Sequence, residues 1–145
     1  MQITEKGRIL GVDYGDVRTG LAISDPTGFL ASGIGYIKPG GMKNTAVAVV
    51  AAAREQNAVG IVVGLPKNMN GTEGERSDVI RAFVALLAEQ TALPIVLFDE
   101  RLSTMEAHRF LSLTDVGGKK RKQVVDTLSA QIILQDYLDR QKNAK

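Results

Sequence analysis

The sequence predicts an α/β fold with a mixed five-stranded sheet, in which an antiparallel meander precedes parallel strands and helices cover both faces. Two observations support this prediction. Three short apolar segments separated by turn residues come first, as in an antiparallel meander. Helical and strand patterns then alternate along the chain, which is typical of parallel strands joined by helices.

The meander is expected within the first 37 residues. Its first strand is predicted in RILGVDYG (8–15), a short apolar run that ends in a turn signal. The next two strands are predicted in RTGLAISD (18–25) and GFLASGIGYI (28–37), with the turn DPTG (25–28) between them.

The second half of the sheet is expected from two buried strands, VGIVVGLP (59–66) and LPIVLFDE (93–100). An Ala-rich helix should precede the first of them over 42–56. A polar loop (67–75) and a helix with apolar residues at helical spacing should separate the two strands; these residues are Val79, Ile80, Phe83 and Leu87.

The C-terminal part should hold two helices. Ser103 and Glu106 have the spacing of a capping box, so a short helix is expected to begin there. LTDVGGKKRK (113–122) is predicted to be a flexible connection, and the last helix should run from about 123 to 141. Because the chain has no repeat and no evident linker, residues 1–145 are interpreted as a single domain.

Composition excludes several classes of function. The 145 residues include 44% hydrophobic residues and no cysteine, so disulfides, thiolate metal sites and cysteine nucleophiles are excluded. No apolar run approaches the roughly 20 residues of a membrane span, and no signal pattern is present, so a cytoplasmic protein without membrane contact is expected. The net charge is only +2, but GGKKRK (117–122) concentrates positive charge.

Acidic residues occur at three places where burial would ordinarily exclude them. Asp13 lies at the end of the first predicted strand, and Asp99 and Glu100 close the fifth. Asp126 lies four residues before Ala130, on the helix stripe that should face the sheet. In a mixed sheet the first and fifth strands can end at one edge, and the last helix can bring a third carboxylate over it.

Clustered carboxylates repel one another unless a cation lies among them. Mg²⁺ and Mn²⁺ prefer such oxygen ligands, and two ions about 3.5–4 Å apart can bind both the attacking and the leaving oxygen of a phosphodiester. Each acid also has an ordinary interpretation, which stays open at this point. Asp13 could cap a turn, and Asp99 and Glu100 could pair with Arg101. Asp126 could be an acid in the first turns of the last helix, where the helix dipole stabilises negative charge.

The chain resembles the YqgF/RuvX family in four segments: GVDYGDVRTGLAISD (11–25), GLPKNMNGTEGERS (64–77), FDERLST (98–104) and KKRKQVVDTLSAQIIL (119–134). The match extends from about residue 8 to residue 137. Members of this family are bacterial RNase H-like proteins, described as Holliday junction resolvases and as nucleases that mature the 5′ end of precursor 16S rRNA.

The resemblance implies an RNase H-like core and a catalytic, metal-binding carboxylate set of Asp13, Glu100 and Asp126, with Mg²⁺ or Mn²⁺ as cofactor. Fold relatives often supply the second acid from the strand beside the first. Asp99 therefore stays open as an alternative or additional ligand.

Nucleic acid should be bound by polar and basic residues near the same edge. The candidates are Arg18, Lys67, Asn68, Asn70, Arg101 and the basic residues at the start of the last helix in the family, Lys119, Lys120, Arg121 and Lys122. Phosphate contacts of this kind position a substrate without reading its bases. Turn formation explains Asn70 equally well, and Arg18 could be an exposed hairpin charge.

The expected function is that of a metal-dependent nuclease acting on structured nucleic acid, with 5′-end processing of precursor 16S rRNA favoured over cleavage of branched DNA. Ribosomal assembly intermediates are then expected partners. The alternatives are a Holliday junction resolvase and a nucleic-acid-binding regulatory factor without turnover. Nucleotide phosphotransfer is disfavoured, because kinases with a related core close two domains around ATP. The sequence leaves monomer and homodimer open.

Overall fold

The computed structural model describes residues 2–38, 40–68, 70–100 and 118–143, the last range with side chains for residues 128–142 only. Within these residues five strands form one sheet, in the order β3-β2-β1-β4-β5. The strands β1 (Ile9–Asp13), β2 (Thr19–Ser24) and β3 (Ala31–Ile37) are antiparallel neighbours. The strands β4 (Gly60–Leu65) and β5 (Ile95–Asp99) run parallel to β1. The predicted mixed sheet is confirmed.

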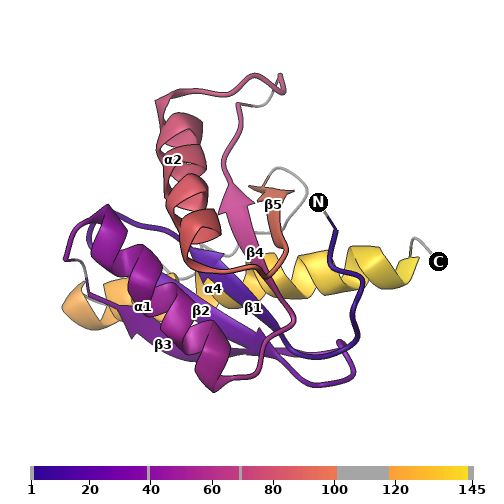
Figure 1. The fold of residues 1–145 in the computed structure, drawn as a ribbon. Coiled ribbons are helices and arrows are strands. Elements are labelled where there is room, and N and C mark those ends of the chain that lie inside the picture. The colour runs from indigo at the N-terminus through magenta and orange to yellow at the C-terminus, as the bar shows by residue number, and fades with distance from the viewer. Residues whose placement is uncertain (1, 39, 69, 101–117, 144–145) are drawn as a thin grey trace.

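Helices cover both faces of this sheet, as expected (Figure 1). On one face, α1 (Met42–Glu55) and α2 (Glu75–Gln90) bury a core against β1 and β4. The strand side chains in this core are Leu10, Val12, Ile61, Val63 and Leu65. On the other face, α4 (Gly118–Asn143) packs a stripe at helical spacing; its buried members are Ala130, Ile133, Leu134, Tyr137 and Leu138. None of the helices in the described part of the chain is long and apolar enough to cross a membrane.

The beginning of α4 corrects one prediction. The helix starts at Gly118 rather than near residue 123, so the basic residues 119–122 lie in its first turns and not in a flexible connection. Lysine and arginine are good helix formers, and glycine at the first position marks the boundary. The short helix predicted at Ser103 falls outside the described residues.

A glycine in β1 fixes how closely α4 approaches the sheet. A Cβ on Gly11 would lie 2.7 Å from Cβ of Leu134 and 3.2 Å from the carbonyl oxygen of Ala130. The first distance is shorter than real Cβ contacts and the second is tighter than most, so a side chain at Gly11 would require Leu134 or the helix to shift. The glycine before Asp13 in GVDYG therefore serves helix packing.

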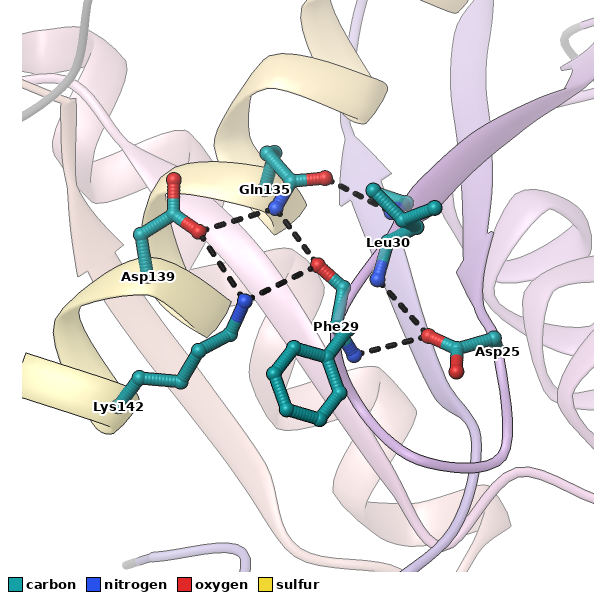
Figure 2. A network of polar contacts seen from close by, with 7 residues as sticks. Asp25, Phe29, Leu30, Gln135, Asp139 and Lys142 are labelled. Atoms are coloured by element: carbon teal, nitrogen blue, oxygen red, sulfur yellow. Dashed lines mark hydrogen bonds and ion pairs between the residues drawn. The ribbon is translucent and has the colours of Figure 1, made fainter.

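The C-terminal half of α4 is tied to the turn between β2 and β3 (Figure 2). Gln135 accepts a hydrogen bond from the Ala31 amide at 2.9 Å and donates one to the Phe29 carbonyl at 2.9 Å. Lys142 also donates to that carbonyl, at 3.3 Å. Within the turn, backbone hydrogen bonds from Leu30 and Phe29 and a hydrogen bond from the Thr27 side chain hold the pKa of Asp25 below its ordinary value.

Candidate functional site

The candidate site is the edge of the sheet at which the parallel strands end. Asp13 is the last residue of β1, and Asp99 is the last residue of β5. The registers align Val12 with Val63 of β4 and Leu65 of β4 with Asp99. Parallel strands end at the same edge, so these acids, far apart in sequence, lie at one edge of the molecule.

The carboxylate of Glu100, the residue after β5, reaches back over β4. A Cβ on Gly64 would lie 3.1 Å from Oε2 of Glu100 and 2.6 Å from Cδ1 of Ile133 in α4. Gly64 and Asp13 each directly follow the last residues that pair β4 with β1, Val63 of β4 and Val12 of β1. The absence of a side chain at Gly64 leaves the space in which the Glu100 carboxylate lies.

Asp13 and Glu100 share one face of the sheet, the face covered by α4. Asp13 is two residues beyond Gly11 and therefore lies on the same face of β1, the face that contacts α4. The Glu100 carboxylate and Ile133 of α4 both lie close to Gly64. Asp99 follows Phe98, which packs with the α4 core, and is two residues beyond Leu97, which packs with the other core. Alternation along β5 therefore directs Asp99 toward the α2 side, away from Asp13.

The backbone of α4 passes over this edge in its first half. Tyr137 lies in one cluster with Ile9 at the start of β1, and Ala130 lies against Gly11 in its middle, so α4 runs opposite to β1. Asp126 precedes Ala130 by one turn, a rise of about 6 Å. Asp13 follows Gly11 by a similar ~6.6 Å. The backbone of Asp126 is thus at the same position along the α4 axis as Asp13. The side chain of Asp126 is not among those that the structure describes.

A metal ion would fit the chemistry of this edge. Two carboxylates from different elements lie on one face of the sheet, and a glycine between them leaves room that a Cβ would fill. Among the residues described, no group of three or more metal-ligating side chains is gathered. The third predicted acid, Asp126, is not among the residues with described side chains.

Two predicted cations lie at the same edge. Arg18, in the connection from β1 to β2, has its guanidinium carbon 5.3 Å from the ring centroid of Tyr36. Tyr36 pairs with Gly20, which pairs with Asp13, so the three residues form one row across the sheet. Lys67 lies in the loop that follows β4, where its charge contributes to lowering the pKa of Glu73, after the larger effect of Arg81.

The polar loop after β4 uses its asparagines to close itself. The Asn68 side chain donates to the Thr72 hydroxyl at 2.9 Å, and the side-chain Oδ1 of Asn70 accepts hydrogen bonds from the Thr72 hydroxyl at 2.7 Å and the Thr72 amide at 3.1 Å. Gly71, between them, has a positive φ of 88°. These contacts agree with the turn-forming interpretation of Asn70. The loop stands at the same edge as Asp13, because it follows β4.

The remaining predicted substrate residues lie where side chains are not described. Arg101 falls outside the described residues altogether. Lys119, Lys120, Arg121 and Lys122 lie in the first turns of α4, where the structure describes the backbone alone.

Sequence reasoning missed Arg76 and Tyr14. Arg76, in the first turn of α2, donates a 2.6 Å hydrogen bond to the carbonyl of Tyr14, the residue after Asp13. Burial and the negative charge of Asp16 raise the pKa of Tyr14. Arg76 and Tyr14 are 62 positions apart, and no local sequence pattern predicts a contact over that separation. Gly64 did have a signal, because a glycine inside an apolar strand often marks a close approach.

Comparison with known proteins identifies the family of this chain. The profile of the family described as "RuvX: Holliday junction resolvase" matches residues 7–140. The chain belongs to the RuvX family. Two bacterial relatives match this chain over nearly its full length. A protein of Thermoanaerobacter pseudethanolicus is 46% identical, over 94% of this chain and 99% of its own, and one of Bacillus cytotoxicus is 47% identical, over 91% and 98%. Both are named "Putative pre-16S rRNA nuclease".

The RuvX chain also shares its fold with a solved resolvase. The structure "T. thermophilus RuvC in complex with Holliday junction substrate" superposes with a TM-score of 0.53, over 92% of this chain and 96% of that one. The two sequences are 13% identical, so the likeness concerns the fold alone. It confirms the RNase H-like architecture expected from the sequence.

Proposed function

We propose that this RuvX-family chain is a metal-dependent nuclease that hydrolyses phosphodiester bonds of structured nucleic acid. The observation that carries the proposal is the Glu100 carboxylate lying over Gly64, on the same edge and face of the sheet as Asp13. A cation bound between the two carboxylates would offset their repulsion and desolvation.

The proposed substrate is precursor 16S rRNA, processed at its 5′ end. Support for this RNA as the substrate comes from the relatives of 46% and 47% identity, which are named "Putative pre-16S rRNA nuclease" and match the chain over nearly its full length. The family description instead names Holliday junction resolution, which is the alternative substrate. On the rRNA proposal, ribosomal assembly intermediates are the expected partners.

The proposed metal ligands are Asp13, Glu100 and Asp126, for Mg²⁺ or Mn²⁺ in a two-metal arrangement. Such ions, when bound, supply an activated water and stabilise the departing 3′ oxygen. Asp13 and Glu100 would hold them from the strand ends and Asp126 from α4. Asp99 is the weaker candidate, because alternation along β5 directs it to the opposite face.

Basic residues around this edge would position the nucleic acid backbone. Arg18 and Lys67 follow β1 and β4, and Arg101 follows Glu100 in sequence. The start of α4 adds Lys119, Lys120, Arg121 and Lys122. Positive charge at a helix N-terminus opposes the helix dipole, at a cost of about 0.3–1 kcal/mol per charge, and a bound phosphate would relieve that cost. Asn68 and Asn70 would contribute mainly by shaping their loop.

The test of the catalytic proposal is Asp13→Asn, which keeps the side-chain shape and removes the charge. Metal-dependent cleavage of precursor 16S rRNA should fall at least about 100-fold, because even partners of metal ligands are worth 10–100-fold. Melting temperature and RNA affinity without metal should stay near wild type. Asp139→Asn, at the opposite end of α4, is the matched control and should cleave normally.

The substrate is decided by giving the purified protein precursor 16S rRNA and a four-way DNA junction, each with and without Mn²⁺. Cleavage of the RNA alone supports the rRNA proposal, and symmetric nicking of the junction supports the alternative. Binding without any metal-dependent product would overturn the nuclease proposal in favour of a regulatory factor. Cleavage by Asp13→Asn at the wild-type rate would contradict the proposed ligand set.

A further inference from the structure

An arginine from α2 holds the backbone immediately beyond Asp13. Nη2 of Arg76 donates to the Tyr14 carbonyl at 2.6 Å, and Nη1 donates to Oδ1 of Asp16 at 3.0 Å. The same guanidinium lies over the Tyr14 ring, 5.6 Å from its centroid. Both terminal nitrogens of Arg76 are therefore engaged by the segment that follows β1.

Tyr14 also contacts the buried side of α2. Its ring stacks on Phe83 with centroids 4.2 Å apart and an angle of 28° between the planes, and Phe83 is fully buried. Tyr14 thus contacts both a core residue and a charged residue of the same helix. On the far side of the connection, the Gly15 amide approaches the Thr19 hydroxyl at 3.5 Å.

The contacts of Arg76 lie just beyond the point where the pairing of β1 with β4 ends. The parallel register between β1 and β4 ends at Val12 and Val63, one residue before Asp13. Asp13 pairs with Gly20 on the β2 side only. The Tyr14 carbonyl has left the ladder, and the hydrogen bond from Arg76 takes the place of a strand partner.

We propose that Arg76 is a positioning residue for the metal site: by fixing the Tyr14 peptide, it holds the Asp13 carboxylate in the orientation that binds the ion. This inference rests on the proposed nuclease function. Metal binding needs ligands held to within about 0.5 Å, and the hydrogen bond from Arg76 fixes the peptide that directly follows Asp13. A direct substrate role for Arg76 is disfavoured, because its terminal nitrogens already have protein partners.

The experiment compares wild type with Arg76→Gln, Arg76→Lys and the matched control Arg54→Gln, which removes an exposed arginine from the last turn of α1. Two quantities are measured: Mn²⁺ affinity by calorimetry without RNA, and kcat and KM for cleavage of precursor rRNA across Mn²⁺ concentrations. Circular dichroism and melting temperature report whether each variant folds.

Arg76→Gln should weaken Mn²⁺ binding about 10–100-fold and lower kcat at limiting metal, with little change in KM for RNA. Arg76→Lys keeps the charge and one donor group, so it should recover part of the lost Mn²⁺ affinity and kcat. If Arg76→Gln does not fold, Arg76→Lys is compared with wild type instead. Asp16→Asn, which leaves the Tyr14 bond in place, should cost less than Arg76→Gln. The Arg54→Gln control should match wild type.

Wild-type Mn²⁺ affinity and kcat in Arg76→Gln would overturn the inference. So would a raised KM with unchanged kcat and a weaker salt dependence, since that result identifies Arg76 as a phosphate contact. If wild type itself neither binds Mn²⁺ nor cleaves, the proposed function fails. If wild type does both while Arg76→Gln equals Arg54→Gln, only the positioning role fails.

Discussion

At the scale of single residues, Gly64 shows how a missing side chain makes a site. Its Cβ position is occupied on one side by Ile133 of α4 and on the other by the Glu100 carboxylate. Gly64 and Asp13 each come directly after the last residues that pair β4 with β1. A methyl group at Gly64 would press both on the helix and on the carboxylate.

Gly64→Ala should therefore affect stability and catalysis together. Overpacking against Ile133 should reduce the free energy of unfolding by about 1–3 kcal/mol, measured by urea denaturation. Displacing Glu100 should lower the cleavage rate by about 100-fold, because misplacing a catalytic group by about 1 Å has that effect.

The control is Gly60→Ala at the other end of the same strand. A Cβ at Gly60 would lie 2.5 Å from Cδ1 of Ile3, so it also overpacks, but no carboxylate is near it among the contacts described. It should lower stability and leave the cleavage rate near wild type. Equal rate losses in the two variants would contradict a specific role for the space over Gly64.

At the scale of elements, α4 joins two ends of the molecule with different tasks. Its C-terminal half is anchored to the turn between β2 and β3 by Gln135 and Lys142 (Figure 2). Its first turns contain no acid and carry four consecutive basic residues. A helix optimised only for stability would carry acids rather than bases in these turns, because negative charge near the N-terminus stabilises a helix.

Lys119→Gln combined with Lys120→Gln should therefore stabilise the free protein while weakening RNA binding. The free energy of unfolding should rise by about 0.3–1 kcal/mol for each charge removed. The slope of log K against log salt for RNA binding should become shallower by about 0.7–0.9 for each phosphate that the variant no longer neutralises. Thermal unfolding and salt titration of binding measure both effects. Reduced stability with an unchanged salt slope would show that these lysines serve the fold.

At the scale of the whole molecule, the site depends on three elements meeting correctly. Strand ends supply Asp13 and Glu100, and the long helix passes over the same edge. Ion binding should therefore stabilise the native state relative to the unfolded chain, in which these residues are far apart.

Mn²⁺ should raise the melting temperature of wild type, by the equivalent of about 2.7 kcal/mol at one hundred times the dissociation constant. The shift should vanish with excess chelator and be strongly reduced in Asp13→Asn. Differential scanning calorimetry at increasing Mn²⁺ measures it. An identical shift in Asp13→Asn would show that the ions bind elsewhere.

Much of this architecture could be predicted from local pattern. Alternating turn signals and apolar runs were enough for the meander, the parallel strands and their helices, because burial period and turn chemistry are local properties. The start of α4 was predicted about five residues too late, since glycine pairs resemble a loop while the lysines that follow favour helix. Asp13 and Glu100 were chosen as site residues from their strand ends and from family resemblance.

The sequence by itself determined which elements form and that acids stand at their ends. Only the tertiary structure decided that Glu100, two strands away from β1, reaches over Gly64 on the face of Asp13, while alternation directs Asp99 to the other face. It also brought Arg76 to the Tyr14 carbonyl. The physical reason is that strand order, register and helix placement are set by burial summed over the whole chain, which no short segment contains.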